Sequence, residues 1–195
     1  METCYDIPDA KLHESDLKFI REFCKFMENL SENLNITVED KFSKTYSIIV
    51  NKPPRLTHKQ LKQINMMNSS IKNCTLNLEQ KSFKIELMKH GNRSKKRSRD
   101  IEESIVPKTY DLTVVDKKDK QHIRSILGYF KSMTDLEFSI DIKKNTLNYD
   151  IKISDIDLIR MKDIVRAFDN SLVFIEEAGI DFPQSEVYMI IRKIN

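Results

Sequence analysis

The sequence predicts an α+β protein of two similar halves, each with the order helix, hairpin, helix, hairpin and an antiparallel sheet covered by helices on one face. Three observations predict this class. Stretches with apolar residues at helical spacing alternate with short stretches in which every second residue is apolar. This order recurs after about a hundred residues, as in an internal duplication. A polar, basic stretch separates the two runs.

Residues 1–14 are expected to form an N-terminal tail, and residues 15–90 the first half. The elements expected in this half are a helix over about 15–33, a hairpin of strands 34–39 and 45–51, a helix capped by Thr57 and Gln60 with apolar positions as far as Ile71, and a hairpin around Gln80-Lys81. The two half-sheets either stay separate or join edge to edge with all helices on one face.

Residues 91–107 are expected to form a flexible basic linker, and residues 108–195 the second half. The elements expected in this half are a strand over 110–114, a helix over about 118–133, a hairpin of 138–142 with 147–153, a helix capped by Ser154 and Asp157 that reaches about residue 169, and final strands over 172–175 and 186–193. The segment 179–184 is expected to separate the last two strands.

The composition limits the classes of function. The 195 residues include 33 Lys and Arg against 30 Asp and Glu, so any basic contact must be local. With only 3 glycines, a glycine-rich phosphate loop is not expected. The N-terminus has no secretion signal and no apolar run is long enough for a membrane span, which favours the nucleus or cytoplasm over secretion and predicts no membrane partner.

No catalytic or metal-binding constellation is recognisable. The cysteines Cys4, Cys24 and Cys74 have no metal-clip or redox spacing. The four histidines lie far apart and lack partners at zinc-ligand spacing (His13, His58, His90 and His122). We therefore expect no catalytic residue, no metal and no cofactor, and a protein that acts by binding.

A cationic cluster in and beside the linker is the most specific local feature. Its residues are Lys89, Arg93, Lys95, Lys96, Arg97 and Arg99. Such a segment is typical of a nuclear-import signal or a contact to nucleic-acid phosphates, and its alternative reading is a solvated tether. No aromatic residue is interleaved with the charges, which argues against base stacking.

The sequence leaves two binding functions open. The first is a nuclear or nucleic-acid-associated accessory protein; in topology alone, the repeated helix-plus-hairpin order resembles DNA sliding clamps, although no residue diagnostic of that family is present and no family is assigned. The second is a protein–protein assembly module, including a homo-oligomer formed through free sheet edges, in which the linker is only a tether or import tag. An enzyme with a site assembled from distant residues is a third, less favoured class.

Overall fold

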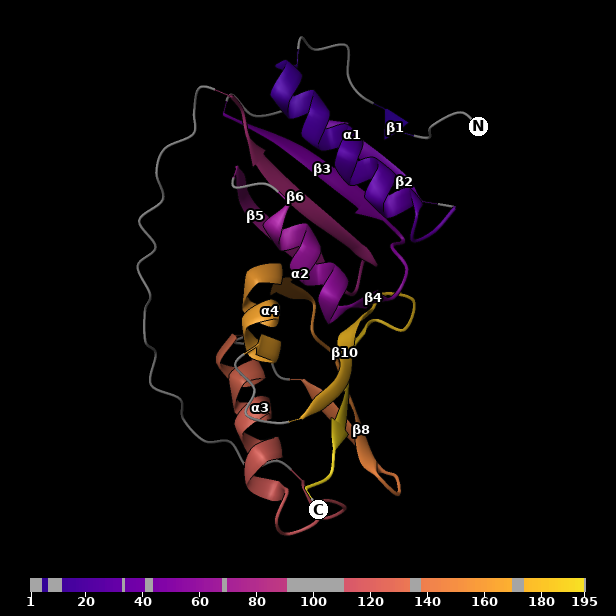
Figure 1. Cartoon of the computed structure of the whole chain (residues 1–195), viewed down its shortest axis with the longest axis vertical. Coiled ribbons are helices and arrows are strands. Elements are labelled where there is room, and N and C mark those ends of the chain that lie inside the picture. Colours follow the sequence, from indigo (N-terminus) through magenta and orange to yellow (C-terminus); the bar gives the residue numbers. More distant parts are fainter. Residues whose placement is uncertain are drawn as a thin grey trace.

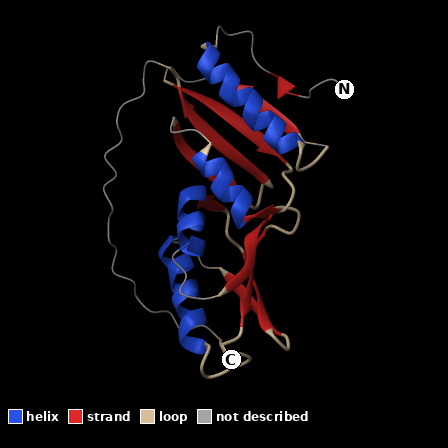
Figure 2. Ribbon diagram, viewed as in Figure 1, coloured by secondary structure: helices blue, strands red, loops and turns tan. Residues whose placement is uncertain are grey.

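The computed structural model describes residues 5–6, 12–32, 34–40, 44–67, 70–90, 111–133, 138–169 and 174–194. Within these ranges the protein is α+β, with two sheets and four helices (Figure 2). The helices are α1 (Glu14–Glu28), α2 (His58–Met66), α3 (Lys120–Met133) and α4 (Met161–Asp169). Figure 1 shows α1 lying across one sheet and α3 lying beside the other, with α2 and α4 in contact with each other between them.

The first sheet, here sheet A, has the strand order β1-β2-β3-β6-β5-β9. Its strands are β1 (Tyr5–Asp6), β2 (Asn35–Glu39), β3 (Thr45–Asn51), β5 (Ile71–Asn77), β6 (Ser82–Met88) and β9 (Leu158–Arg160). All neighbours in it are antiparallel except β1, which pairs with β2 in parallel.

The second sheet, here sheet B, has the order β4-β10-β11-β8-β7 and is antiparallel throughout. Its strands are β4 (Leu56–Thr57), β7 (Ser139–Lys144), β8 (Asn148–Ser154), β10 (Ile175–Asp181) and β11 (Glu186–Arg192). In the hairpins of 34–51, 71–88 and 139–154, the strands β2, β6 and β8 confirm the expected alternation, because every second residue of each is buried.

Each sheet receives one short strand from the other part of the chain. β4 precedes α2 yet pairs with β10, joining Leu56 to Ile180 and Thr57 to Gly179. β9 precedes α4 yet pairs with β5, joining Leu76 to Ile159. The sheets are therefore neither independent nor fused into one long sheet, and the buried apolar residues of both form a single connected core.

Helix ends follow ordinary capping chemistry. Thr57 and Gln60 form the expected capping box: the Thr57 hydroxyl accepts from the Gln60 amide, and the Gln60 carboxamide accepts from the Thr57 amide at 2.8 Å. The first helix begins one residue before Ser15, and its N-cap is His13, whose ring nitrogen accepts from the Ser15 amide at 3.3 Å.

A partly buried polar cluster, here called the polar knot, joins the segment just before α3 to sheet B. The Tyr149 hydroxyl, from β8, shares its single proton between the carboxylates of Asp116 at 2.9 Å and Asp119 at 2.8 Å, and it accepts from the Asp116 amide at 3.1 Å. Asp119 also accepts from the Ile194 amide at 3.1 Å, and Lys144 forms an ion pair with Asp116 at 2.6 Å. Burial, together with these two carboxylates, raises the pKa of Tyr149 far above its ordinary value, so the hydroxyl keeps its proton.

Three sequence predictions are wrong in position. The part of the expected strand 110–114 that the structure describes forms turns, because Leu112 and Val115 reach the core from an irregular segment. Ser154 and Asp157 do not cap a helix: β9 intervenes, and α4 begins at Met161. Ile71 is the first residue of β5 rather than the end of a helix.

The last two strands form an antiparallel pair as expected, but the first of them lies further along the chain than predicted. β10 runs through Gly179 to Asp181, where a connecting segment was expected. The linker prediction for 91–107 lies outside the described residues, as does most of the predicted tail 1–14, of which the structure describes Tyr5, Asp6 and residues 12–14. None of the helices in the described ranges is long and apolar enough to cross a membrane.

Replacing Tyr149 by Phe tests the polar knot. The variant leaves Asp119, which is 3% exposed, without its hydroxyl donor, so we expect the free energy of unfolding to fall by about 1–3 kcal/mol in urea titrations. Tyr46→Phe is the matched control in sheet A, where the ring contacts Lys89, and we expect it to change less. Equal losses in the two variants would contradict the assigned role.

Gly179→Ala tests the joint between β4 and β10. A Cβ at residue 179 would lie 2.1 Å from the Leu56 carbonyl oxygen, and this obstacle is backbone rather than a flexible side chain. We expect a loss of roughly 1–3 kcal/mol or more in the free energy of unfolding, and faster hydrogen exchange at Leu56 and Thr57. Unchanged exchange at these amides would contradict the joint.

Candidate nucleic-acid interface

Three helices form a continuous row along the molecule. α2 contacts α4, and α4 contacts α3, so helices from before and after the linker region lie side by side (Figures 1 and 2). Each presents its apolar side to the core, with Leu61 and Ile64 of α2 and Ile164 and Phe168 of α4 fully or almost fully buried. The opposite side of each helix faces solvent.

The solvent side of this row is basic. α2 and α3 contain no acidic residue, and α4 contains two. The basic residues of the three helices are Lys59, Lys62, Lys120, Arg124, Lys131, Lys162 and Arg166. Lys59, Arg124 and Lys162 are among the exposed ones. We call these seven residues the basic helix row.

The two acidic residues of α4 are already engaged. Asp163 is 8% exposed and pairs with Arg160 of β9 at 2.5 Å. Asp169 pairs with His58 at 3.1 Å and Lys62 at 3.0 Å. With seven cations against these two carboxylates, the three helices together carry an excess of positive charge.

The outward faces of the sheets have a different charge pattern. On sheet A, Glu86 lies 3.9 Å from Lys72 and 3.7 Å from Lys84. On sheet B, cation and carboxylate again alternate in pairs, which are Arg55–Glu177 at 2.9 Å, Lys152–Glu186 at 2.6 Å and Lys143–Asp141 at 3.9 Å. These outward groups comprise five cations and four carboxylates, whereas α2, α3 and α4 together have seven cations and two carboxylates.

The basic helix row suits phosphate rather than bases. The exposed large apolar side chains of the described residues include one aromatic, Phe174, and it lies outside the three helices. Stacking on single-stranded bases needs exposed rings, whereas contacts to a duplex backbone need only cations on a firm scaffold.

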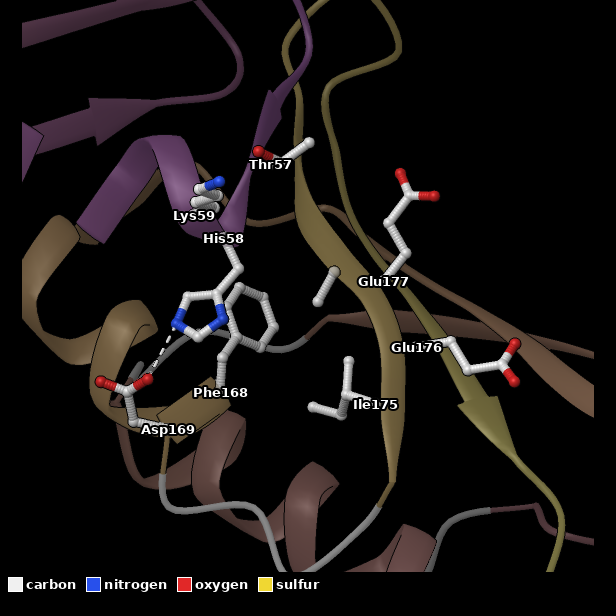
Figure 3. A pocket seen from close by; sticks show the side chains of 9 residues that line it. Thr57, His58, Lys59, Phe168, Asp169, Ile175, Glu176 and Glu177 are labelled. Carbon is white, nitrogen blue, oxygen red and sulfur yellow. Dashed lines mark ion pairs between the residues drawn. The ribbon is translucent and has the colours of Figure 1, made fainter. Parts of the chain in front are cut away.

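A shallow hollow of about 430 Å³ lies beside the row, between the start of α2, the end of α4 and β10 (Figure 3). The His58 imidazole points across it to Asp169, with Phe168 edge-on to the ring at 5.2 Å between centroids. Burial lowers the pKa of His58, and the opposing pull of Asp169 does not overcome it. In Figure 3, Glu176 and Glu177 point away from the imidazole, so the hollow gathers no acid–base pair beyond His58 and Asp169.

The structure describes one of the six predicted linker-cluster residues, Lys89. It forms an ion pair with Asp40, lies over the Tyr46 ring at 4.8 Å and donates its backbone amide to Lys44 at 3.0 Å. Its side chain is 19% exposed, so it belongs to the folded part of sheet A. Arg93, Lys95, Lys96, Arg97 and Arg99 lie outside the described residues.

The described thiols are poor candidates for chemistry. Cys24 and Cys74 are free and buried. Burial, with a smaller effect of Glu28, raises the pKa of Cys24 to about 12, and burial also raises that of Cys74. A thiol held protonated is neither nucleophile nor metal ligand. Among the described residues no group of His, Cys, Asp and Glu is placed to hold a metal ion.

The sequence carries a weak signal for the basic helix row. Lys162 and Arg166 stand beside Asp163 and Asp169, so α4 alone is neutral. The signal was the lack of acidic residues over 58–66 and 120–133, and it became informative once these helices were placed in one row.

Comparison with known proteins finds no matching family model, no similar curated protein and no similar solved structure.

The half-buried imidazole of His58 predicts a pH effect on stability. An unfolded histidine takes up a proton near its ordinary pKa of 6.5, while folded His58 resists protonation, so stability is complete above that pH and declines as the pH falls below it. We expect urea unfolding across this range to show a shallower pH dependence for His58→Gln than for the unaltered protein. Parallel curves for the two proteins would contradict the assignment.

Proposed function

We propose that this protein is a non-catalytic, nucleic-acid-associated accessory protein that binds the phosphate backbone with the basic helix row. The observation that carries the proposal is the separation of charge between the two sides of the fold. Taken together, α2, α3 and α4 have seven cations and two carboxylates, whereas the outward sheet groups comprise five cations and four carboxylates. A chain with a formal net charge of only +3 attracts a polyanion best when its excess is gathered on one surface.

We propose further that the scaffold is an internal duplication about a pseudo-twofold axis. Its support is a set of irregularities that recur after about a hundred residues. The four non-glycine residues with positive φ in the described ranges make two such pairs, Lys52 with Asp155 and Lys81 with Ser185. β5 and β10 both have a register shift near their first residues, at Ile71/Asn73 and Ile175/Glu177.

The hairpin turns after β5 and β10 also correspond in detail. Asn77 accepts from the Gln80 amide at 2.8 Å, and Asp181 accepts from the Gln184 amide at 3.0 Å. Each turn buries its next residue completely, Leu78 in one and Phe182 in the other. A positive φ is costly for these residue types, so its recurrence at matching turns favours common descent over chance.

Duplication gives the basic helix row a physical origin. α2 and α4 each have nine residues and follow the two exchanged strands, so the same position of each half supplies one helix of the row. A repeated surface of this kind fits a repeating ligand such as a duplex backbone. The linker cluster Arg93–Arg99 supplies either a second phosphate contact or a nuclear-import signal in the proposed function.

The basic helix row is tested by a triple variant, Lys59→Gln, Arg124→Gln and Lys162→Gln, all at exposed positions. We expect it to weaken binding of duplex DNA and to reduce the slope of log affinity against log salt by up to about 3, since each lost phosphate contact removes about 0.9. Fluorescence anisotropy over a salt series measures both quantities.

The matched control removes three cations from the sheet side, with Lys72→Gln, Lys84→Gln and Lys152→Gln. Its change in net charge is the same, so a non-local effect of charge would weaken both variants equally. Equal weakening, or no binding by the unaltered protein at low salt, would contradict the proposal. Deleting residues 92–100 separates the contribution of the linker from that of the basic helix row. In this deletion variant we expect the triple substitution to reduce the salt slope by the same amount as in the full chain.

A further inference from the structure

β7 is the outer strand of sheet B, and among the described residues no strand pairs with its far side. The corresponding strand of sheet A, β2, is not at an edge. β2 is paired on its far side by β1, and its inward residues Ile36 and Val38 are each 3% exposed. The inward residues of β7, Ile140 and Ile142, pack against the core but are only half-buried. The edge of sheet B at β7 therefore has partly exposed isoleucines and, within the described residues, backbone N–H and C=O groups that no strand pairs.

The two faces of β7 differ in chemistry. Ile140 and Ile142 face the core, opposite Ile153 and Ile151 of β8. Asp141 and Lys143 lie on the other face, where both are exposed and 3.9 Å apart. One face of the edge is thus aliphatic, and the other carries one negative and one positive charge two residues apart.

We propose that β7 is a self-association edge on which a second copy of this chain pairs antiparallel, β7 to β7, with Ile142 on the twofold axis. The charges select this partner and this register. A twofold axis perpendicular to the sheet keeps each face matched with itself, so only registers that oppose residues of the same face are allowed.

Three registers place a residue near the middle of the strand on the axis. Centring on Asp141 opposes two aspartates, and centring on Lys143 opposes two lysines; like charges directly across a strand pair destabilise it. Centring on Ile142 puts Asp141 opposite Lys143 of the second copy, twice by symmetry, and brings the two Ile142 side chains together on the apolar face. The charges of β7 therefore disfavour the registers centred on Asp141 and Lys143 and favour the register centred on Ile142.

Lys144 does not oppose this pairing. In the chosen register it faces Ile140 of the second copy, but its ammonium is held by Asp116 at 2.6 Å. Its aliphatic stem is then left to cover the neighbouring isoleucine. Pairing would join the two B sheets into one and leave α3 and α4 of both copies on the same side. This inference does not depend on nucleic-acid binding, and its test uses protein alone.

Charge exchange on the full-length chain gives the sharpest test. Sedimentation velocity over a concentration series should show a reversible monomer–dimer equilibrium for the unaltered protein. Asp141→Lys alone, or Lys143→Asp alone, places like charges opposite each other and should weaken self-association by about tenfold or more. The double variant Asp141→Lys/Lys143→Asp restores two opposite-charge pairs and should return to within about threefold of the unaltered protein.

Cross-linking fixes the register independently. In a Cys4→Ser background, Ile142→Cys should give a disulfide-linked dimer on mild oxidation, because directly opposed residues of antiparallel strands have Cα atoms about 4.5–5.5 Å apart. Lys152→Cys, on β8 behind the edge, is the matched control and should stay monomeric.

Either of two results would overturn the proposal. One is an unaltered protein that remains monomeric at every concentration, as it would if a segment of the same chain covered β7. The other is a dimer that the single charge variants do not weaken or the double variant does not restore, which would place the interface elsewhere.

Discussion

The exchange of β4 and β9 between the sheets is the constraint on which the rest of the structure depends. Leu56 and Thr57 hydrogen-bond to β10 in sheet B, and α2 follows directly from them. Leu158–Arg160 pair with β5 in sheet A, and α4 follows directly from them. Each helix is thus anchored at its first residue to the sheet of the other part of the chain. This crossing brings α2 against α4 and unites the apolar residues of both sheets in one core.

Contacts beside the crossing hold the same geometry. Phe182, fully buried in the β10–β11 turn, packs on Phe83 of β6 with 6.1 Å between ring centroids. Lys81 donates to the Pro183 carbonyl at 2.9 Å, and the Leu78 amide donates to the Asp157 carbonyl at 2.9 Å. Lys62 and His58 of α2 pair with Asp169 of α4. The contact between these two helices therefore also compensates the negative charge of Asp169. In this way the crossing controls both the packing of the core and the sign of the exposed charge.

Periodicity predicted the long elements well, because a sheet with one buried face imposes alternation and an amphipathic helix imposes its own spacing. Thr57 and Gln60 also revealed their helix start, since a capping box is local chemistry. β1, β4 and β9 escaped prediction because two or three residues are too few to show a period, and their partners lie far away in sequence. Turns and irregular segments over 111–119 take the place of an expected strand, because Leu112 and Val115 can be buried without pairing to a neighbouring strand. The dense cations of 93–99 are visible in the sequence alone, whereas the basic helix row forms only when the fold brings α2, α3 and α4 together.

Footprinting of lysines tests the central claim most directly, that nucleic acid is bound on the helix side of the fold. The full chain is acetylated with and without duplex DNA at low salt, and the modified sites are quantified by mass spectrometry. The account predicts protection of Lys59, Lys62 and Lys162, with Lys72, Lys84 and Lys152 equally reactive in both samples. Protection on the sheet side, or the same reactivity at every lysine with and without DNA, would contradict it.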